Sequence, residues 1–453
     1  MVTSQIALFG VHHGVTRLMS AQEEPDKGEG FLSHGYLLVV ATSLSAVVTL
    51  TLSRNLLGQL LNDPSLGEFL ILLLPFLVLN PIRHISYSAL RATNQSRSAV
   101  LSQDIAGRVL PISLLCAAIA LSRPTLGAVV FWVGTPLIIT ITSLYFLRDV
   151  LSVQNLIAKS PNPGTLSRIW SFSWPLAISA FVFIFLSNTD ILMIGYFLNS
   201  DSVGYYRAIQ PLKQAAIFLT GSFSFLFLPL ATEYFEDGNM EGLQDLYTIS
   251  TKWMTLGTFP IVLVFGLFSD DVVRTFFGTK YLPAASVLTL LITGLFFRTI
   301  VGLNGDMVKA LDRTKIELWS AAAGLATNLG FNVILIPRYG INGAAIGTVV
   351  GYLVYNCGEV LLIFRVTGVH PFSLNNIKPL IPPLLFAFAI SEFTSDTQLN
   401  LIVLLAIGIL LLMVQVVSVV ATRSLGPADI HIIERVEAEA NINLDWVKSM
   451  STE

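Results

Sequence analysis

This chain contains the basic turn Ser88-Ala89-Leu90-Arg91-Ala92-Thr93-Asn94-Gln95-Ser96-Arg97 and, later, the similar turn Met307-Val308-Lys309-Ala310-Leu311-Asp312-Arg313-Thr314-Lys315. Each turn closes one long apolar run and opens the next. Duplicated bundles of membrane helices are the usual architecture of transporters that rock around a central cavity. The repeat therefore makes transport the leading hypothesis.

Two further pairs of segments repeat at nearly the same separation. Residues 123–130 resemble residues 338–345, each as a tight turn between two helices, and the polar loop 22–30 resembles the loop 233–242. Three turn types that coincide in order and spacing indicate an internal duplication. We therefore expect two similar helical lobes that enclose a central cavity.

The composition excludes an ordinary soluble domain. Apolar residues make up 53% of the chain and charged residues only 12%, whereas about a quarter of the residues of soluble domains are charged. An apolar run of about 20 residues crosses a bilayer as a helix, which satisfies its own backbone hydrogen bonds where lipid cannot. The sequence predicts an all-α polytopic membrane protein. Its expected spans are residues 35–53, 69–90, 104–121, 126–147, 174–194, 208–230, 253–273, 284–306, 317–336, 343–364, 379–392 and 399–421.

These spans predict the domain organisation. The first apolar run, residues 6–11, is too short to cross a bilayer, so we expect the first lobe to lack its first span, through an upstream start or a truncated domain. Lys and Arg concentrate in one set of alternate loops, which places both basic turns and the tail in the cytoplasm by the positive-inside rule. The expected parts are an N-terminal lobe (1–148), a cytoplasmic linker (149–173), a C-terminal lobe (174–365), an extra helix pair (366–425) and a cytoplasmic tail (426–453).

Arg83 and Arg298 are the candidate substrate-binding residues. Both lie inside expected spans, at corresponding places in the two halves. A cation inside a spanning helix is costly and is retained mainly where it faces a watery cavity or a partner. Guanidinium groups suit phosphate because their planar donors stay charged. The alternatives are a structural ion pair, for example with Asp190 or Asp306, or a side chain that reaches for the membrane interface.

Three acidic residues and one amide complete the candidate set. Asp190, Asp306 and Glu359 lie within expected spans and are candidates for coupling to a proton or sodium ion, or for counter-ions of a buried arginine. Asn304 is a candidate for binding sugar hydroxyls. Hydrogen bonding between helices explains such an amide equally well.

No catalytic residue, metal site or cofactor is predicted. His12-His13 has no acidic or Cys ligand nearby at a useful spacing. The chain has no phosphate-binding loop of the G-x-x-x-x-G-K-[ST] type, so direct use of ATP is not expected. Nothing indicates a nucleic-acid partner.

A family resemblance rests on several segments. They are Ser173-Trp174-Pro175-Leu176, the run Asn188-Thr189-Asp190-Ile191-Leu192-Met193-Ile194-Gly195-Tyr196-Phe197, the run Val203-Gly204-Tyr205-Tyr206-Arg207-Ala208, the turn at Lys309 and the pattern from Asn332 to Ala345. They resemble the start of the second lobe and the later turns of polysaccharide-synthesis flippases. This family belongs to the multidrug, oligosaccharidyl-lipid and polysaccharide exporter superfamily.

The resemblance implies fourteen spans, in two six-helix lobes and a final pair, that work by alternating access. It implies a cargo in which a glycan is linked to a polyprenyl or dolichyl phosphate or pyrophosphate carrier, with glycan-assembly enzymes as partners in the cell membrane. An anionic head cannot cross hydrocarbon unaided, and a cationic groove would shield it. The flippase is therefore favoured over a drug antiporter.

Two rival functions stay open. A cation-coupled multidrug or metabolite antiporter would depend on acidic residues such as Asp190. A polytopic glycosyltransferase or polymerase usually needs a large outer loop or an acidic pair near the membrane surface. The outer loops here are short, and the one adjacent acidic pair, Asp270-Asp271, is explained by a solvated helix end. We therefore do not expect an enzyme.

Overall fold

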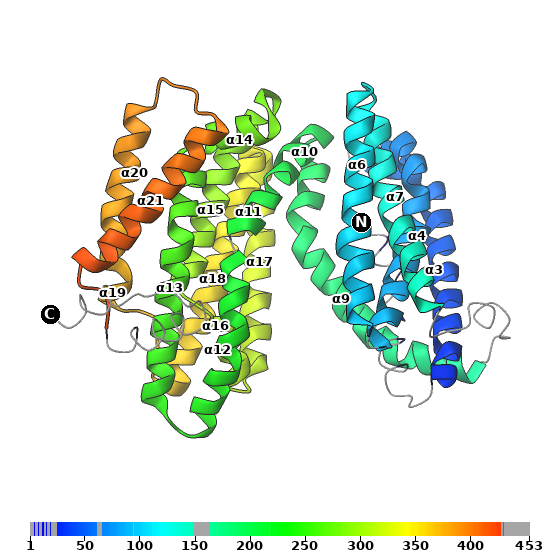
Figure 1. Ribbon diagram of the computed structural model, residues 1–453, viewed down its shortest axis with the longest axis horizontal. Coiled ribbons are helices and arrows are strands. Elements are labelled where there is room, and N and C mark those ends of the chain that lie inside the picture. Colours follow the sequence, from blue (N-terminus) through cyan, green and yellow to red (C-terminus); the bar gives the residue numbers. More distant parts are fainter. Residues whose placement is uncertain are drawn as a thin grey trace. The chain divides into compact units, whose positions relative to one another are not determined.

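The computed structural model describes residues 25–60, 66–93, 95–148, 163–216 and 218–426, together with residues 4, 8, 11, 12, 15, 19 and 429. Helices and their short connections make up this part of the chain, in which no strand occurs (Figure 1). Nine of the described helices are long and apolar enough to cross a membrane. The prediction of an all-α, multi-pass membrane protein is confirmed. The expected loss of a first span and the tail from residue 430 onward lie outside the described residues.

The chain divides into two compact units, Met1–Thr189 and Asp190–Glu453. Buried apolar side chains such as Val39, Ile85 and Leu147 form the core of the first unit. Its helices are α3 (Pro25–Leu60), α4 (Leu66–Ala92), α5 (Ser96–Val100), the π-helix η1 (Leu101–Ala106), α6 (Gly107–Ala120), α7 (Pro124–Leu147) and most of α9 (Pro163–Phe197).

The second unit is built around α13 (Met240–Leu267) and α15 (Ala285–Ile300), whose buried side chains include Phe259, Leu291 and Ile292. The long hairpin α17 (Thr314–Tyr339) and α18 (Ile341–Thr367) packs beside α15. The remaining elements are α10 (Ser200–Ala208), α11 (Gln210–Ala216), α12 (Phe218–Glu236), α14 (Ser269–Phe277), η2 (Thr279–Ala284), α16 (Asn304–Ala310), α19 (Leu374–Ile377), η3 (Lys378–Leu380), α20 (Ile381–Phe393) and α21 (Leu401–Ala421).

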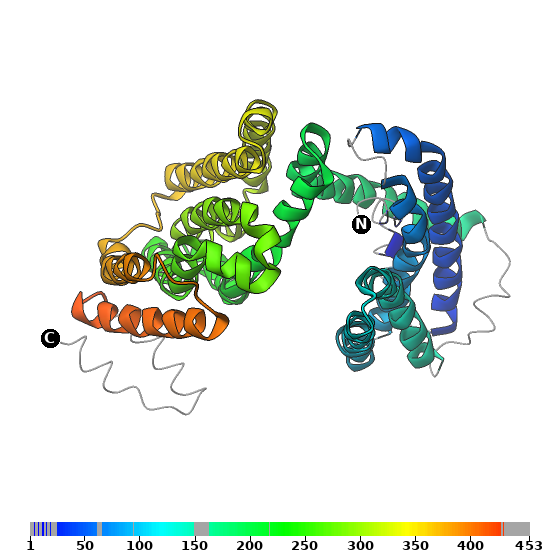
Figure 2. The ribbon, with the colours of Figure 1, turned by 90° about the horizontal axis from the view of Figure 1, so that it is seen from above.

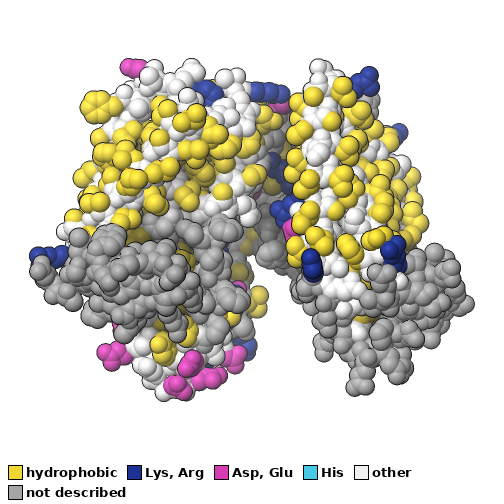
Figure 3. All heavy atoms as spheres, viewed as in Figure 1, with side chains coloured by type: hydrophobic (Ala, Val, Ile, Leu, Met, Phe, Trp, Pro, Cys, Tyr) yellow, Lys and Arg dark blue, Asp and Glu magenta, His cyan; other side chains and the backbone are white. Residues whose placement is uncertain are grey.

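Large apolar side chains point outward from both units. Leu52 is 81% exposed, Ile402 77% and Phe393 91%. Hydrophobic side chains cover much of the described surface visible in Figure 3. Such a surface would aggregate in water, but it is what a helix presents to lipid acyl chains.

The tight turns predicted from the repeats are present in the structure. The turn between α6 and α7 contains Ser122 in a left-handed conformation (φ 60°), and the turn between α17 and α18 contains Gly340 at φ 59°. Asp312 takes a similar conformation (φ 51°) between α16 and α17. Each turn reverses the chain within a few residues, which sets the two flanking helices side by side.

Two expected element boundaries need correction. α9 begins at Pro163, so residues 163–173, which we expected in the linker, are helical. Proline suits the first position of a helix because its missing N–H would have no helical partner there. The expected span 284–306 is not continuous, because α15 ends at Ile300 and α16 begins only at Asn304.

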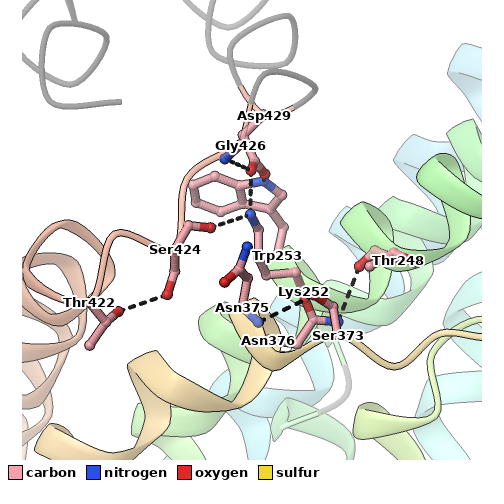
Figure 4. A network of polar contacts seen from close by, with 10 residues as sticks. All are labelled: Thr248, Lys252, Trp253, Ser373, Asn375, Asn376, Thr422, Ser424, Gly426 and Asp429. Carbon is pink, nitrogen blue, oxygen red and sulfur yellow. Dashed lines mark hydrogen bonds and ion pairs between the residues drawn. The ribbon is translucent and has the colours of Figure 1, made fainter. Parts of the chain in front are cut away.

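The final helix pair α20–α21 is fastened to the second unit by polar contacts. Its helices lie next to each other at the edge of that unit (Figure 2). Beyond α21, Asp429 forms an ion pair with Lys252 and accepts a hydrogen bond from Trp253 Nε1 at 2.9 Å (Figure 4). Lys252 Nζ also donates to the carbonyl oxygen of Ser424 at 2.9 Å. This buried network ties the end of α21 to α13.

Candidate functional site

The interruption between α15 and α16 is the starting point of the site. Gly302 has φ +77°, a conformation that residues with a Cβ rarely adopt. A Cβ at this position would lie 2.0 Å from Thr251 Oγ1 and 3.1 Å from the Tyr247 ring. Only glycine therefore fits the turn, and the helical hydrogen bonds stop there.

Helix α13 satisfies the backbone groups that the interruption frees. The hydroxyl of Tyr247 donates to the carbonyl oxygen of Val301 at 2.9 Å, and Thr255 Oγ1 donates to that of Thr299 at 3.3 Å. Irregular backbone at membrane depth is tolerated where protein covers it or where it lines a cavity. Interrupted helices of this kind form substrate and ion sites in many transporters.

A cavity of about 470 Å³ opens beside the interruption, within the second unit. This volume lies in the range of small-molecule sites. Side chains from α11, α12, α13, α15, α16, α17 and α18 line it, and most of them are polar or charged. The polar and charged members are Gln214, Ser224, Arg298, Thr299, Asn304, Asp306, Lys309, Glu317, Tyr355 and Asn356.

Arg298 stands in the last turn of α15 and lines this cavity. In the described part of the chain, no carboxylate lies within ion-pair distance of its guanidinium. The structural pairs considered from the sequence, with Asp190 or Asp306, do not form. The side chain thus offers its donors and its charge to the cavity.

The second cation of the cavity is already compensated. Lys309 Nζ lies 3.4 Å from Asp306 Oδ1 and 3.8 Å from Glu317 Oε1. Asp306 also accepts a short hydrogen bond from the hydroxyl of Ser224. Asp306 is therefore a counter-ion, but of a lysine rather than of an arginine.

Asn304 and Glu359 meet directly behind the interruption. Asn304 Nδ2 donates to Glu359 Oε2 at 2.7 Å and to Asn356 Oδ1 at 3.1 Å. Glu359 is fully buried, and its Oε1 has no hydrogen-bond partner among the described residues. The amide nitrogen of Asn304 thus joins α16 to α18, as the helix–helix alternative predicted.

Asp190 lies in a separate polar cluster of the second unit, which we call the Asp190 cluster. It accepts hydrogen bonds from Thr348 Oγ1 at 2.6 Å, Asn332 Nδ2 at 2.8 Å, Tyr206 Oη at 3.0 Å and Asn328 Nδ2 at 3.1 Å. All four partners are neutral, and within the described residues no Lys or Arg forms an ion pair with Asp190. An arginine counter-ion, one of the two roles considered for Asp190, is therefore not found in the described part of the chain.

A buried acceptor without a described partner lies beside this half-buried carboxylate. Asn332 is fully buried, and its Oδ1 has no hydrogen-bond partner in the part of the chain that the structure describes. The sequence did not predict Tyr206, Asn332 or Thr348 as site residues, although Tyr206 and Asn332 lie in segments that carry the family resemblance. The spacing of Asn328 and Asn332, four residues apart on one helix face, was the one available signal.

Arg83 belongs to the first unit. It lies on α4, where its Nε donates to Asn80 Oδ1 at 3.1 Å and its Nη2 lies 2.8 Å from His84 Nε2. Asn80 in turn donates to the hydroxyl of Ser4 at 2.7 Å. These partners are uncharged groups or a histidine, and no described carboxylate pairs with Arg83. Its sharing of one cavity with Arg298 stays a prediction.

Fold and site together define a class: a multi-pass helical membrane protein with an interrupted helix beside a polar cavity. Residues 1–286 match the polysaccharide biosynthesis protein family. The chain belongs to this family, which confirms the family resemblance predicted from the sequence.

Individual relatives are distant. The chain is 27% identical over 176 residues to the membrane protein MJ1068 of Methanocaldococcus jannaschii, covering 38% of this chain and 34% of the relative. It is 22% identical over 204 residues to a protein of Haloferax volcanii named probable low-salt glycan biosynthesis flippase Agl15, covering 45% and 43%. The matches thus span less than half the length of these curated relatives.

A solved structure shares the fold. The lipid II flippase MurJ, in an inward closed conformation, aligns with a TM-score of 0.67 over 91% of this chain and 88% of its own, at 16% identity. At this identity the likeness concerns the fold alone.

Proposed function

We propose that this protein is a flippase that moves an oligosaccharide, linked to a polyprenyl or dolichyl phosphate or pyrophosphate, across the cell membrane by alternating access. The glycan would serve surface polysaccharide or glycoprotein assembly, in contact with membrane lipids and glycan-assembly enzymes. The tail is proposed to be cytoplasmic. Membership of the polysaccharide biosynthesis protein family and the flippase names of the relatives support the proposal of a flippase.

Arg298 is the observation that carries the proposal. A guanidinium within a spanning helix costs about 2.5–3.5 kcal/mol on insertion scales. Here no described carboxylate lies within ion-pair distance of the guanidinium, and the side chain lines a cavity of about 470 Å³. A phosphate that enters the cavity would supply the missing negative charge and accept the guanidinium donors.

The test is transport in proteoliposomes of a fluorescent polyprenyl-diphosphate-linked sugar. A hydrogen bond to a charged group contributes about 1.5–3 kcal/mol, so Arg298→Ala should slow transport by about ten- to a hundredfold. Arg338→Ala is the matched control, because that arginine is exposed at the end of α17 and does not line the cavity. Unchanged transport by the Arg298 variant would refute the proposal.

A role for Arg83 on the same cargo is part of the proposal. If both arginines contact one phosphate-bearing head, the effects of Arg83→Ala and Arg298→Ala are not additive in the double variant. Additive losses would instead assign the two arginines to independent steps.

We also propose that the Asp190 cluster binds the coupling cation, a proton or a sodium ion. A half-buried carboxylate without a described cationic partner, beside the Oδ1 of Asn332 that has no described partner, offers oxygen ligands of the kind that a hard cation requires. Asp190→Asn should make transport insensitive to the coupling gradient. Imposed sodium and pH gradients in separate vesicle preparations would identify the ion.

The antiporter alternative predicts a different response to the Arg298 substitution. A cation-coupled drug or metabolite antiporter would lose transport in Asp190→Asn but keep it in Arg298→Ala. Transport of a cationic dye by both the original protein and the Arg298 variant would favour this alternative. Purified protein that transfers sugar between lipid-linked substrates would favour the polymerase.

A further inference from the structure

The charges of the cavity carry an inference about which sugar it accepts. From the sequence, this half of the molecule was expected to contribute positive charge. The lining instead contains two cations, Arg298 and Lys309, and two carboxylates, Asp306 and Glu317. The carboxylate of Glu359 lies directly behind Asn304.

The charged side chains of the lining differ on the two sides of the interruption at Gly302. Arg298 precedes the interruption and has no described carboxylate partner. After the interruption, Lys309 lies within 4 Å of both Asp306 and Glu317, at 3.4 and 3.8 Å. One cation is therefore available to an incoming anion, while the other is held between two acids.

We propose that Asp306 and Glu317 are specificity-determining residues that exclude a negatively charged sugar from the cavity. This inference rests on the proposed flippase function. Arg298 takes the phosphate, and the sugar attached to it lies against the acidic side after the interruption. The accepted sugar is neutral, N-acetylated or amino-substituted, and uronic acids are rejected.

Two physical effects produce the selection. A sugar carboxylate near Asp306 and Glu317 meets like charges, and Lys309 cannot compensate because it already binds both acids. Sugar hydroxyl, amide or ammonium groups instead donate hydrogen bonds to these carboxylates, and bonds with one charged partner are the stronger kind. Other neutral side chains that line the cavity, such as Gln214 and Tyr355, suit the remaining hydroxyls.

The test compares two lipids that differ in one group. Purified full-length protein is titrated with polyprenyl-diphosphate-linked N-acetylglucosamine and with the same lipid carrying glucuronic acid. We expect the N-acetylglucosamine lipid to bind at least tenfold more tightly. In Glu317→Gln and in Asp306→Asn, this preference should fall at least fivefold because the acidic lipid binds more tightly than before.

Glu241→Gln is the matched control, since this exposed glutamate in the first turn of α13 does not line the cavity. Its preference should equal that of the original protein. Asp306 also accepts a hydrogen bond from Ser224 and pairs with Lys309, so its replacement could prevent folding. The Glu317 variant tests the proposal in that case.

The outcomes separate this inference from the proposed function. Equal affinity for the two lipids, or variants that lower the affinity for both lipids alike, would overturn the selection by charge. The proposed flippase function would still stand. Binding of neither lipid by the original protein would overturn both proposals. Arg298→Ala should lower the affinity for both lipids, because it removes the contact to the phosphate and not the contact to the sugar.

Discussion

Replacement of Gly302 by alanine should destabilise the second unit and disturb the cavity. A left-handed conformation costs a residue with a Cβ about 1–2 kcal/mol. The new Cβ would also lie 2.0 Å from Thr251 Oγ1, and overpacking of this kind costs about 1–3 kcal/mol. Because the two effects arise independently, we expect a total loss of about 2–5 kcal/mol.

Thermal unfolding of the detergent-solubilised protein, followed by tryptophan fluorescence, measures the effect. One kcal/mol shifts the melting temperature by about 2–4 °C in domains of 150–250 residues, so Gly302→Ala should lower it by at least about 4 °C. Gly330→Ala is the matched control: this glycine lies within α17, and an added Cβ would meet nothing within 4 Å. The control should keep or slightly raise the melting temperature, because alanine favours helix.

A second substitution separates the two causes. Thr251→Ala removes the nearest clashing atom, so the double variant should recover part of the loss while the backbone strain persists. A Gly302→Ala protein as stable as the original would refute the assignment of this turn to glycine alone. A double variant no more stable than Gly302→Ala would refute the steric contribution.

Three further changes test other parts of the structure by the same thermal assay. Lys252→Met leaves Asp429 buried without its ion partner and should cost about 3–5 kcal/mol, much of which Asp429→Leu should restore in the double variant. Ser122→Gly should stabilise the first unit by about 1 kcal/mol, because Ser122 holds φ 60° without being a glycine; a lower melting temperature would contradict this. Asn332→Leu removes a 2.8 Å hydrogen bond to the half-buried Asp190 and should cost about 1–3 kcal/mol; an unchanged melting temperature would contradict this.

The sequence predicted the helices well because one physical requirement dominates them. In lipid every backbone polar group needs an internal partner, so a long apolar run has almost no alternative to a helix. The repeated turns were also predictable, since short polar segments between such runs must reverse the chain. Gly340 lies within residues 338–345, and Ser122 directly precedes residues 123–130, the segment that the sequence had matched to them; both have positive φ.

The interruption at Gly302 was missed for a related reason. Average hydropathy over a window counts apolar side chains and is insensitive to a single positive φ. The run Gly302-Leu303-Asn304-Gly305 inside an otherwise apolar span was the signal, with two glycines and an amide in four residues. The covering hydroxyl of Tyr247 could not be inferred, because it comes from a helix more than fifty residues earlier in the chain.

Which side chains would pair with the charged residues inside the spans was the hardest feature of the site to predict from the sequence. The cost of a buried charge predicts that a partner exists but not which one. One of the two roles considered for Asp190 was that of a counter-ion to an arginine, yet its described hydrogen-bond donors are four neutral side chains from three other helices. Such choices depend on how helices pack against one another, which neither spacing nor composition encodes.

The charge balance of the cavity constrains how the proposed cargo could be neutralised. A pyrophosphate head carries more than one negative charge, while Arg298 is the one cation of the described cavity lining without a carboxylate within ion-pair distance. Lys309 could assist only by leaving Asp306 and Glu317, which would then face the anion directly. If the cargo is a pyrophosphate, as we propose, a second cation from elsewhere in the protein would complete its neutralisation. Arg83, whose described partners carry no carboxylate, is the residue that we propose for that role.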